Sequence, residues 1–89
     1  MNALLIVSAA SALGDATRVA VYSLCDGRLS VQDIAESVNV TSSTICYHLK
    51  VLERAGLVVG RREGRCHRPK RRPERVWELA RDVSQLGRR

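Results

Sequence analysis

The chain has 89 residues, a length that supports a single domain and buries only about 60 to 65% of the surface that the unfolded chain exposes. Its net charge is +6, and 45% of its residues are hydrophobic, with no phenylalanine, one tryptophan and two tyrosines. This composition predicts a small aliphatic core and excludes a membrane-spanning protein, because no apolar run is long enough to cross a bilayer.

The first predicted helix covers residues 1–13, where the sequence is apolar on nearly every side. Such a helix is typically buried between its own domain and a partner, and we expect Leu5 and Ala9 to contact a second subunit. The segment has the apolar run of a secretion signal, but no basic residues precede that run and the segment continues directly into the next helix. We therefore predict a structural helix and a cytoplasmic protein without a membrane partner.

Another helix is predicted to begin near Ser42, because the hydroxyl groups of Thr41 and Ser42 can accept an unpaired backbone N–H. Ile45, Leu49 and Leu52 recur at spacings of four and three residues, which places them on one helical face. A different face carries Ser42, Ser43, Cys46, Tyr47 and Lys50. One face is therefore expected to pack against the domain while the other contacts a partner.

A basic β-hairpin, called the wing, is predicted at residues 57–68. Gly56 tolerates the positive φ with which helices often end, and residues 57–59 form a short β-prone run. Glu63 and Gly64 supply a compact turn. Three arginines flank this turn and can reach a phosphate backbone: Arg61, Arg62 and Arg65.

The positive charge is concentrated at and after the wing. Residues 61–75 contain eight basic and two acidic side chains, a balance of +6, and the seven basic and seven acidic residues elsewhere cancel. The basic residues are Arg61, Arg62, Arg65, Arg68, Lys70, Arg71, Arg72 and Arg75. A block of like charge is often only a solvated surface, but beside a helix with an exposed face it favours contact with the phosphates of nucleic acid.

The last predicted helix covers residues 74–87. An apolar seam runs along it at spacings of three, four and three residues: Val76, Leu79, Val83 and Leu86. Pro69 and Pro73 are expected to keep the preceding segment out of regular structure, with Pro73 in the first turn of the helix. We predict that the seam contacts a second subunit; the alternative is that it folds back on its own domain.

Three motifs follow one another along the chain: LGDATR at residues 13–18, LSVQDIA at 29–35 and SSTICYHLKVLERAGLVVGRREGR at 42–65. Their sequences and order resemble the ArsR/SmtB family of bacterial winged-helix repressors. The resemblance implies a mainly α fold with a small β-hairpin, which is a winged helix-turn-helix of the α+β class. It places the helix-turn-helix at residues 31–55 and the dimer contacts on the N- and C-terminal helices.

The resemblance also implies a homodimeric, sequence-specific DNA-binding transcriptional regulator, a repressor released by a signal that the sequence does not identify. One helix of each subunit is expected to enter the major groove of a roughly palindromic double-stranded DNA operator. Base contacts are expected from Ser42, Ser43, Cys46 and Tyr47. Contacts with DNA phosphates or the minor groove are expected from Lys50, Arg61, Arg62 and Arg65. His48 is also expected among the DNA-binding residues; it matches the helix histidine of the family, whose ordinary role is packing or a phosphate contact.

Enzyme activity and a cofactor are not expected. Neither His48 nor His67 has the spacing to a nucleophile or a carboxylate that catalysis requires, and no glycine-rich phosphate loop occurs. Metal-sensing members of the family carry a Cys-x-Cys pair where this chain has Ser30 and Gln32. A second family site uses Asp and His on the C-terminal helix, where this chain offers only Glu74, Glu78 and Asp82. Neither metal site is therefore predicted.

The three cysteines, Cys25, Cys46 and Cys66, are separated by 21 and 20 residues and form no Cys-x-x-Cys clip. Cys25 is expected to be a small buried hydrophobic residue. Cys46 lies on the exposed helical face, so its oxidation or metallation would obstruct DNA docking, and a thiol, redox or metalloid sensor acting through Cys46 is an alternative function. Two further alternatives are a non-specific nucleic-acid-binding protein and a winged-helix module for protein interaction.

Overall fold

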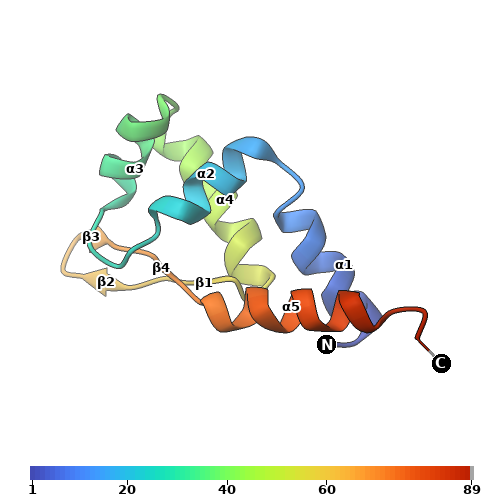
Figure 1. Ribbon diagram of the computed structural model, residues 1–89. Helices are drawn as coiled ribbons and strands as arrows, with labels where there is room; N and C mark the ends of the chain where they lie inside the picture. Colours follow the sequence, from blue (N-terminus) through green and yellow to red (C-terminus); the bar gives the residue numbers. More distant parts are fainter. Residues whose placement is uncertain (89) are drawn as a thin grey trace.

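The computed structural model describes residues 1–88 and shows a helical domain with a small β-structure at one end (Figure 1). The helices are α1 (Ala3–Ala12), α2 (Ala16–Leu24), α3 (Val31–Val38), α4 (Ser42–Arg54) and α5 (Pro73–Gln85). The strands are β1 (Val58–Val59), β2 (Arg62–Glu63), β3 (Cys66–His67) and β4 (Lys70–Arg71). The predicted mainly α fold with a β-hairpin is confirmed.

Local capping explains where the helices begin and end. Asp15 caps α2, and Thr41 caps α4 by accepting the backbone N–H of Thr44 on its Oγ1 at 3.1 Å. The predicted start of α4 at Ser42 is confirmed. Gly56 follows α4 with a φ of 75°, a conformation that residues with a side chain rarely adopt, and so confirms the predicted helix end.

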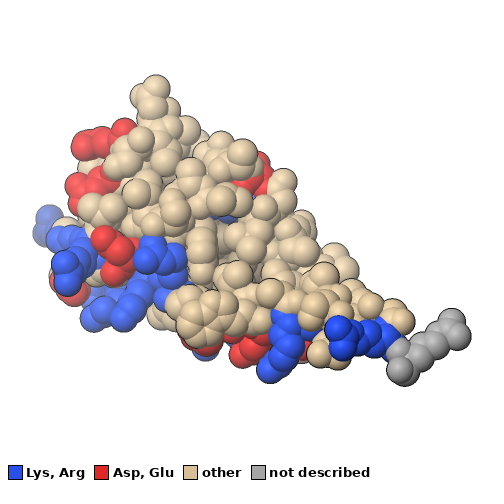
Figure 2. Space-filling model, in the orientation of Figure 1, with Lys and Arg blue, Asp and Glu red and all other residues tan. Residues whose placement is uncertain are grey.

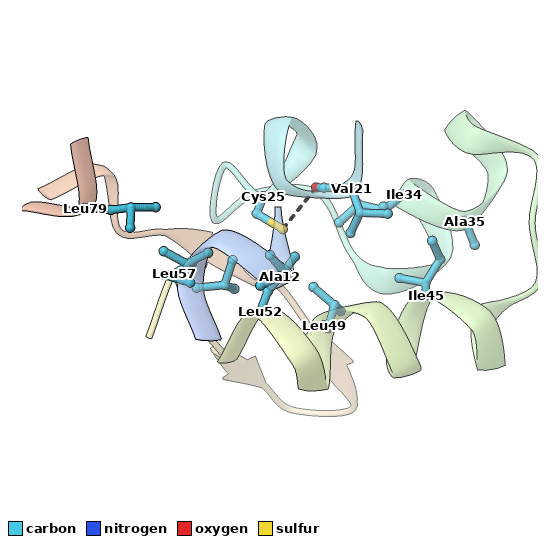
Figure 3. Packing of buried hydrophobic residues seen from close by; sticks show 12 residues of the cluster. Ala12, Val21, Cys25, Ile34, Ala35, Ile45, Leu49, Leu52, Leu57 and Leu79 are labelled. Carbon is cyan, nitrogen blue, oxygen red and sulfur yellow. Dashed lines mark hydrogen bonds between the residues drawn. The ribbon is translucent and has the colours of Figure 1, made fainter. Parts of the chain in front are cut away.

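The core lies where α4 meets the other helices and the first strand (Figure 3). Ile45, Leu49 and Leu52 of α4 point into it and are at most 2% exposed, as their spacing predicted. The other buried hydrophobic residues are Ala9, Ala12, Val21, Cys25, Ile34, Ala35, Leu57, Val58 and Leu79. The core is therefore aliphatic, in agreement with the composition.

Cys25 is wholly buried, and its Sγ donates a hydrogen bond to the carbonyl oxygen of Val21 at 3.2 Å (Figure 3). Burial raises the pKa of this thiol to about 12, so it remains protonated and unreactive near neutral pH. The prediction of a small buried hydrophobic residue is confirmed.

The wing consists of two paired segments. At its outer end β2 pairs antiparallel with β3, with Arg62 opposite His67, and at its base β1 pairs with β4. It therefore extends past the predicted end at residue 68. The prediction that Pro69 keeps this segment irregular was wrong, because Pro69 lies buried between β3 and β4, where its missing N–H interrupts neither pair of strands.

Helix α5 has Pro73 in its first turn, as predicted, but covers Pro73–Gln85 and not residues 74–87. It packs along α1 of the same chain (Figure 1). Ala9 of α1 is wholly buried and Leu79 of α5 is 8% exposed, so both belong to the core of their own chain. The prediction that Ala9 and Leu79 contact a second subunit is corrected accordingly. For this part of the seam, the alternative of a helix folded back on its own domain holds.

Among the helices of residues 1–88, none is by itself long and apolar enough to cross a membrane. Helices α1 and α2 reach the required length and composition only when taken together, and the chain bends by 89° between them.

Candidate nucleic-acid interface

The outward face of α4, which we call the reading face, carries the polar residues that helical spacing predicted. Its exposed side chains are Ser43, Cys46, Tyr47 and Lys50. Ser42 is half-buried, and its Oγ donates a hydrogen bond to Oε1 of Gln32 on α3 at 3.3 Å. The two helices of the helix-turn-helix therefore meet at the start of the reading face, and its remaining side chains extend into solvent.

His48 differs from its neighbours because its side chain points inward. It is only 7% exposed, and its Nδ1 accepts a hydrogen bond from Nε of Arg18 on α2 at 3.2 Å. The expectation that His48 contacts phosphate is therefore corrected, and its role is packing. The helical spacing indicates this burial, because His48 lies three residues after Ile45 and four before Leu52, on the buried face.

The wing presents cationic side chains at its outer end. Its turn lies at Gly64 and Arg65, one residue later than predicted. Arg61, Arg62 and Arg65 are exposed, and none of them forms an ion pair within residues 1–88. Figure 2 shows basic side chains gathered at the end of the molecule where Figure 1 places β2 and β3. Three positive charges are thus available to a partner here.

The remaining arginines of the basic block have structural partners. The guanidinium group of Arg68 donates to the carbonyl of Arg28 and lies 3.6 Å from the carboxylate of Glu63, and Arg71 donates to the carbonyl of Ser23 at 2.5 Å. Two more pairs are Arg72 with Glu74 and Arg75 with Glu78. The seven arginines of the block therefore divide into three exposed at the tip and four with partners in the wing base and α5, while Lys70 is exposed on β4.

The reading face and the wing border the same surface hollows. One hollow of about 600 Å³ is lined by Cys46, Leu49, Lys50, Glu53, Gly60, Arg62 and His67. A second, smaller hollow brings Ser42 and Cys46 of α4 together with Arg62 and Arg65 of the wing. Residues predicted to read bases and residues predicted to contact phosphate thus face one shared surface.

Gly60 permits the close approach of the wing to α4. A Cβ atom at this position would lie 2.7 Å from Nε2 of His67 and 2.9 Å from Oε1 of Glu53. These two side chains, one from the wing and one from α4, are 3.8 Å apart. A residue with a side chain at this position would push them aside, so the glycine contributes to the placement of the wing beside the reading face.

A second exposed surface, which we call the apolar face, lies on α1 and α5. Three predicted dimer contacts are exposed on it, Leu5, Val83 and Leu86, whereas Val76 is half-buried against the core. Three exposed residues of these helices were not predicted: Leu4, Val7 and Trp77. The sequence did not identify them because α1 is apolar on nearly every side, so spacing could not show which side faces its own core.

Within the described residues, no group of three or more His, Cys, Asp and Glu side chains is placed to hold a metal ion. Ser30 caps α3, and Gln32 donates a hydrogen bond to Glu36 at 3.3 Å. The three acidic residues of α5 pair with neighbouring arginines: Glu74, Glu78 and Asp82. The side chains at the two family metal positions are thus engaged in caps, hydrogen bonds and ion pairs.

Residues 15–59 match a family described as "Bacterial regulatory protein, arsR family". The chain belongs to the arsR family. Among curated members, this arsR-family chain is similar to the HTH-type transcriptional regulator KmtR of Mycobacterium tuberculosis, with 43% identity over 61 residues that cover 67% of the chain and 47% of KmtR. The chain spans about half the length of the curated relatives it matches.

Solved structures agree with this assignment. An ArsR-like transcriptional regulator from Rhodococcus sp. RHA1 is similar at a TM-score of 0.83 and 26% identity, covering 94% of this chain and 80% of that one. The homodimeric winged helix-turn-helix DNA-binding domain Mb0332 of Mycobacterium bovis has a TM-score of 0.75 at 22% identity, covering 96% of this chain and 82% of that one. The fold of the arsR-family chain is therefore a winged helix-turn-helix.

Proposed function

We propose that the protein is a sequence-specific DNA-binding transcriptional regulator that acts as a homodimeric repressor. The observation that carries this proposal is the shared hollow in which Ser42 and Cys46 of the reading face meet Arg62 and Arg65 of the wing. A helix with polar, exposed side chains fits the major groove, and arginines beside it neutralise phosphate. Membership of a family of bacterial regulatory proteins supports the same function.

The proposed contacts divide between base reading and backbone binding. Ser42, Ser43, Cys46 and Tyr47 contact base edges, and Lys50, Arg61, Arg62 and Arg65 contact phosphate or the minor groove. Two subunits place their reading helices in successive major grooves, with half-sites about 10 base pairs apart. Release comes from a signal other than a metal at the two family sites, since Ser30 and Gln32 replace the Cys-x-Cys pair and residues 73–86 contain no histidine or cysteine.

The apolar face supports the homodimer. Leu4 is 81% exposed and Val7 64% exposed on α1, and Leu86, directly after α5, is 63% exposed. Apolar side chains exposed together on two adjacent helices are stabilised when a second copy removes them from water. The related M. bovis domain is described as homodimeric, which favours the same assembly here.

The proposal is tested by selecting duplexes from a random library with the reduced protein. Fluorescence anisotropy then compares the most enriched duplex with a scrambled duplex of the same composition over a range of salt concentrations. We expect the enriched duplex to bind at least about 10³-fold more tightly at physiological salt. If both duplexes bind equally with a steep salt dependence, the protein is a non-specific nucleic-acid binder; if neither binds, it serves protein interaction.

Arg62→Ala and Tyr47→Ala are expected to have different effects. In the dimer, Arg62→Ala removes one phosphate contact from each subunit, so it weakens binding to both duplexes alike and reduces the slope of log affinity against log salt by about two. Tyr47→Ala removes a base contact in each half-site, so it lowers discrimination by about 1 to 3 kcal/mol per half-site and leaves the slope unchanged. The same anisotropy titrations measure both quantities. A change of sequence preference in Arg62→Ala without a change of slope would contradict this division.

A thiol sensor is a second candidate function, favoured by one observation: Cys46 is exposed and lines both hollows between α4 and the wing. Hydrogen peroxide would oxidise its thiolate to a sulfenic acid, with reduction of the peroxide to water, and add a polar group where DNA docks. Peroxide is then expected to weaken binding about tenfold in the wild type and not in Cys46→Ser. Cys66→Ser, which also removes an exposed thiol, is the matched control and should respond like the wild type.

A further inference from the structure

Arg18 is a buried cation whose guanidinium group connects three helices. It is 9% exposed, and its NH1 donates to two carbonyls at the end of α1, those of Ser11 at 3.4 Å and Ala12 at 3.3 Å. Its Nε donates to Nδ1 of His48 on α4 at 3.2 Å. The guanidinium carbon also lies 5.8 Å from the ring centre of Tyr47. One side chain of α2 therefore contacts the end of α1 and two adjacent residues of the reading helix.

The partners of Arg18 are specific for a guanidinium group. No carboxylate pairs with this side chain in the described part of the chain. A buried charge requires compensation, and here it comes from the last carbonyls of α1, which carry the negative end of the helix dipole, from a ring nitrogen, and from the nearby carboxylate of Asp15. Lysine cannot reproduce this contact because its ammonium group lacks the planar fork that binds two helices at once.

The contact also determines which ring nitrogen of His48 faces Arg18: Nδ1 accepts the hydrogen bond from Nε of Arg18. His48 and Tyr47 are adjacent in α4, with ring centres 5.4 Å apart and planes inclined by 60°. Tyr47, which is 58% exposed on the reading face, therefore lies beside the His48 ring and the Arg18 guanidinium group.

We propose that Arg18 is a positioning residue for DNA recognition: it orients Tyr47 through His48 and holds the reading helix to the end of α1. This inference rests on the proposed function, because it assigns the geometry of the reading face to a residue that cannot touch DNA. Since α1 also carries part of the apolar face, the same contact links the orientation of the reading helix to the proposed dimer.

Three variants test the inference. Arg18→Met removes the donors, His48→Leu removes the acceptor, and His48→Asn keeps an oxygen near the position of Nδ1. Arg54→Met, which changes an exposed arginine at the end of α4, is the matched control. All are compared below their unfolding transitions, as dimers, on the enriched and the scrambled duplex.

Two readouts are expected to change together. In the DNA-free protein, nitrogen-15 NMR should show an unprotonated, hydrogen-bonded Nδ1 of His48, and Arg18→Met should shift that signal toward a free ring nitrogen. Arg18→Met and His48→Leu should each lower the ratio of affinities for the two duplexes about tenfold, with an unchanged salt slope. His48→Asn should retain most of the ratio, and Arg54→Met all of it.

The outcomes separate this inference from the proposed function. A wild-type protein that binds both duplexes alike overturns the proposed function and this inference with it. A discriminating wild type whose folded Arg18→Met variant keeps the full ratio overturns the inference alone. If Arg18→Met does not fold, the two His48 variants decide: equal loss in His48→Leu and His48→Asn, or no loss in either, overturns the role of the hydrogen bond.

Discussion

Replacing Val83 with aspartate is expected to separate the proposed dimer into folded monomers and to weaken binding to a palindromic duplex by about 10²- to 10⁴-fold. Val83 is 45% exposed on α5, next to the exposed Leu86. In a dimer the new carboxylate would be buried without a partner, whereas in the monomer it remains in water. The affinity falls because a monomer occupies one half-site, and the second half-site must then be bound in a separate bimolecular step.

Val19→Asp is the matched control for this substitution. Val19 is also 45% exposed, but it lies on α2, outside the apolar face of α1 and α5. Sedimentation velocity should find Val83→Asp monomeric and Val19→Asp dimeric, and anisotropy should find equal affinities of both variants for a duplex with a single half-site. A Val83→Asp protein that remains dimeric with full affinity would place the subunit interface elsewhere.

Replacing Leu52 with alanine is expected to lower the free energy of unfolding by about 2 to 5 kcal/mol. Leu52 lies on the inner face of α4 and is completely buried in the core, so the substitution removes apolar contacts and leaves a cavity. The total stability of a small domain is about 5 to 15 kcal/mol, so a loss of this size leaves a substantial part of the molecules unfolded on moderate warming. DNA binding should decline with the folded fraction.

Lys50→Ala is the control for this prediction, because Lys50 is exposed on the same helix and helix propensity differs little between the two substitutions. It should change the free energy of unfolding by no more than about 0.5 kcal/mol. Urea unfolding followed by circular dichroism measures both variants. Equal midpoints for Leu52→Ala and Lys50→Ala would contradict the assignment of Leu52 to the core.

Helix α4 could be predicted almost completely because its signals are local. The hydroxyl of Thr41 caps it, the spacing from Ile45 to Leu52 defines its buried face, and Gly56 permits the turn that follows. Each of these features depends on residues within a few positions of one another. The predicted exposed residues of this helix follow from the same periodicity.

His48 shows where local reasoning fails. Its position agrees with the buried face, but a histidine is buried only where a polar partner is available, and that partner is Arg18, thirty residues earlier in the chain. The motif LGDATR includes Arg18, but the motif match did not indicate a contact between Arg18 and α4. A contact between residues so far apart depends on how the helices pack, which the sequence pattern alone does not specify.

The terminal helices show the same limit on a larger scale. Their apolar composition predicted that they would be buried, but the division of each helix between its own core and the outer surface depends on the packing of α1 against α5. Ala9 and Leu79 face inward, and Leu4 and Val7 face outward. The base of the wing was likewise not predicted, because Val58 pairs with Arg71 across an intervening hairpin.

The wing is fastened at its base and unattached at its tip. Arg71 donates to a carbonyl of α2 and Arg68 to a carbonyl of the loop between α2 and α3. With the hydrogen bond from Gly27 of that loop to the carbonyl of Pro69 at 2.9 Å, these contacts hold the base against the domain. At the tip, open space surrounds Gly64. The two parts can therefore evolve at different rates: substitutions or insertions at the tip alter its reach toward DNA, while the helices that present the reading face keep their packing.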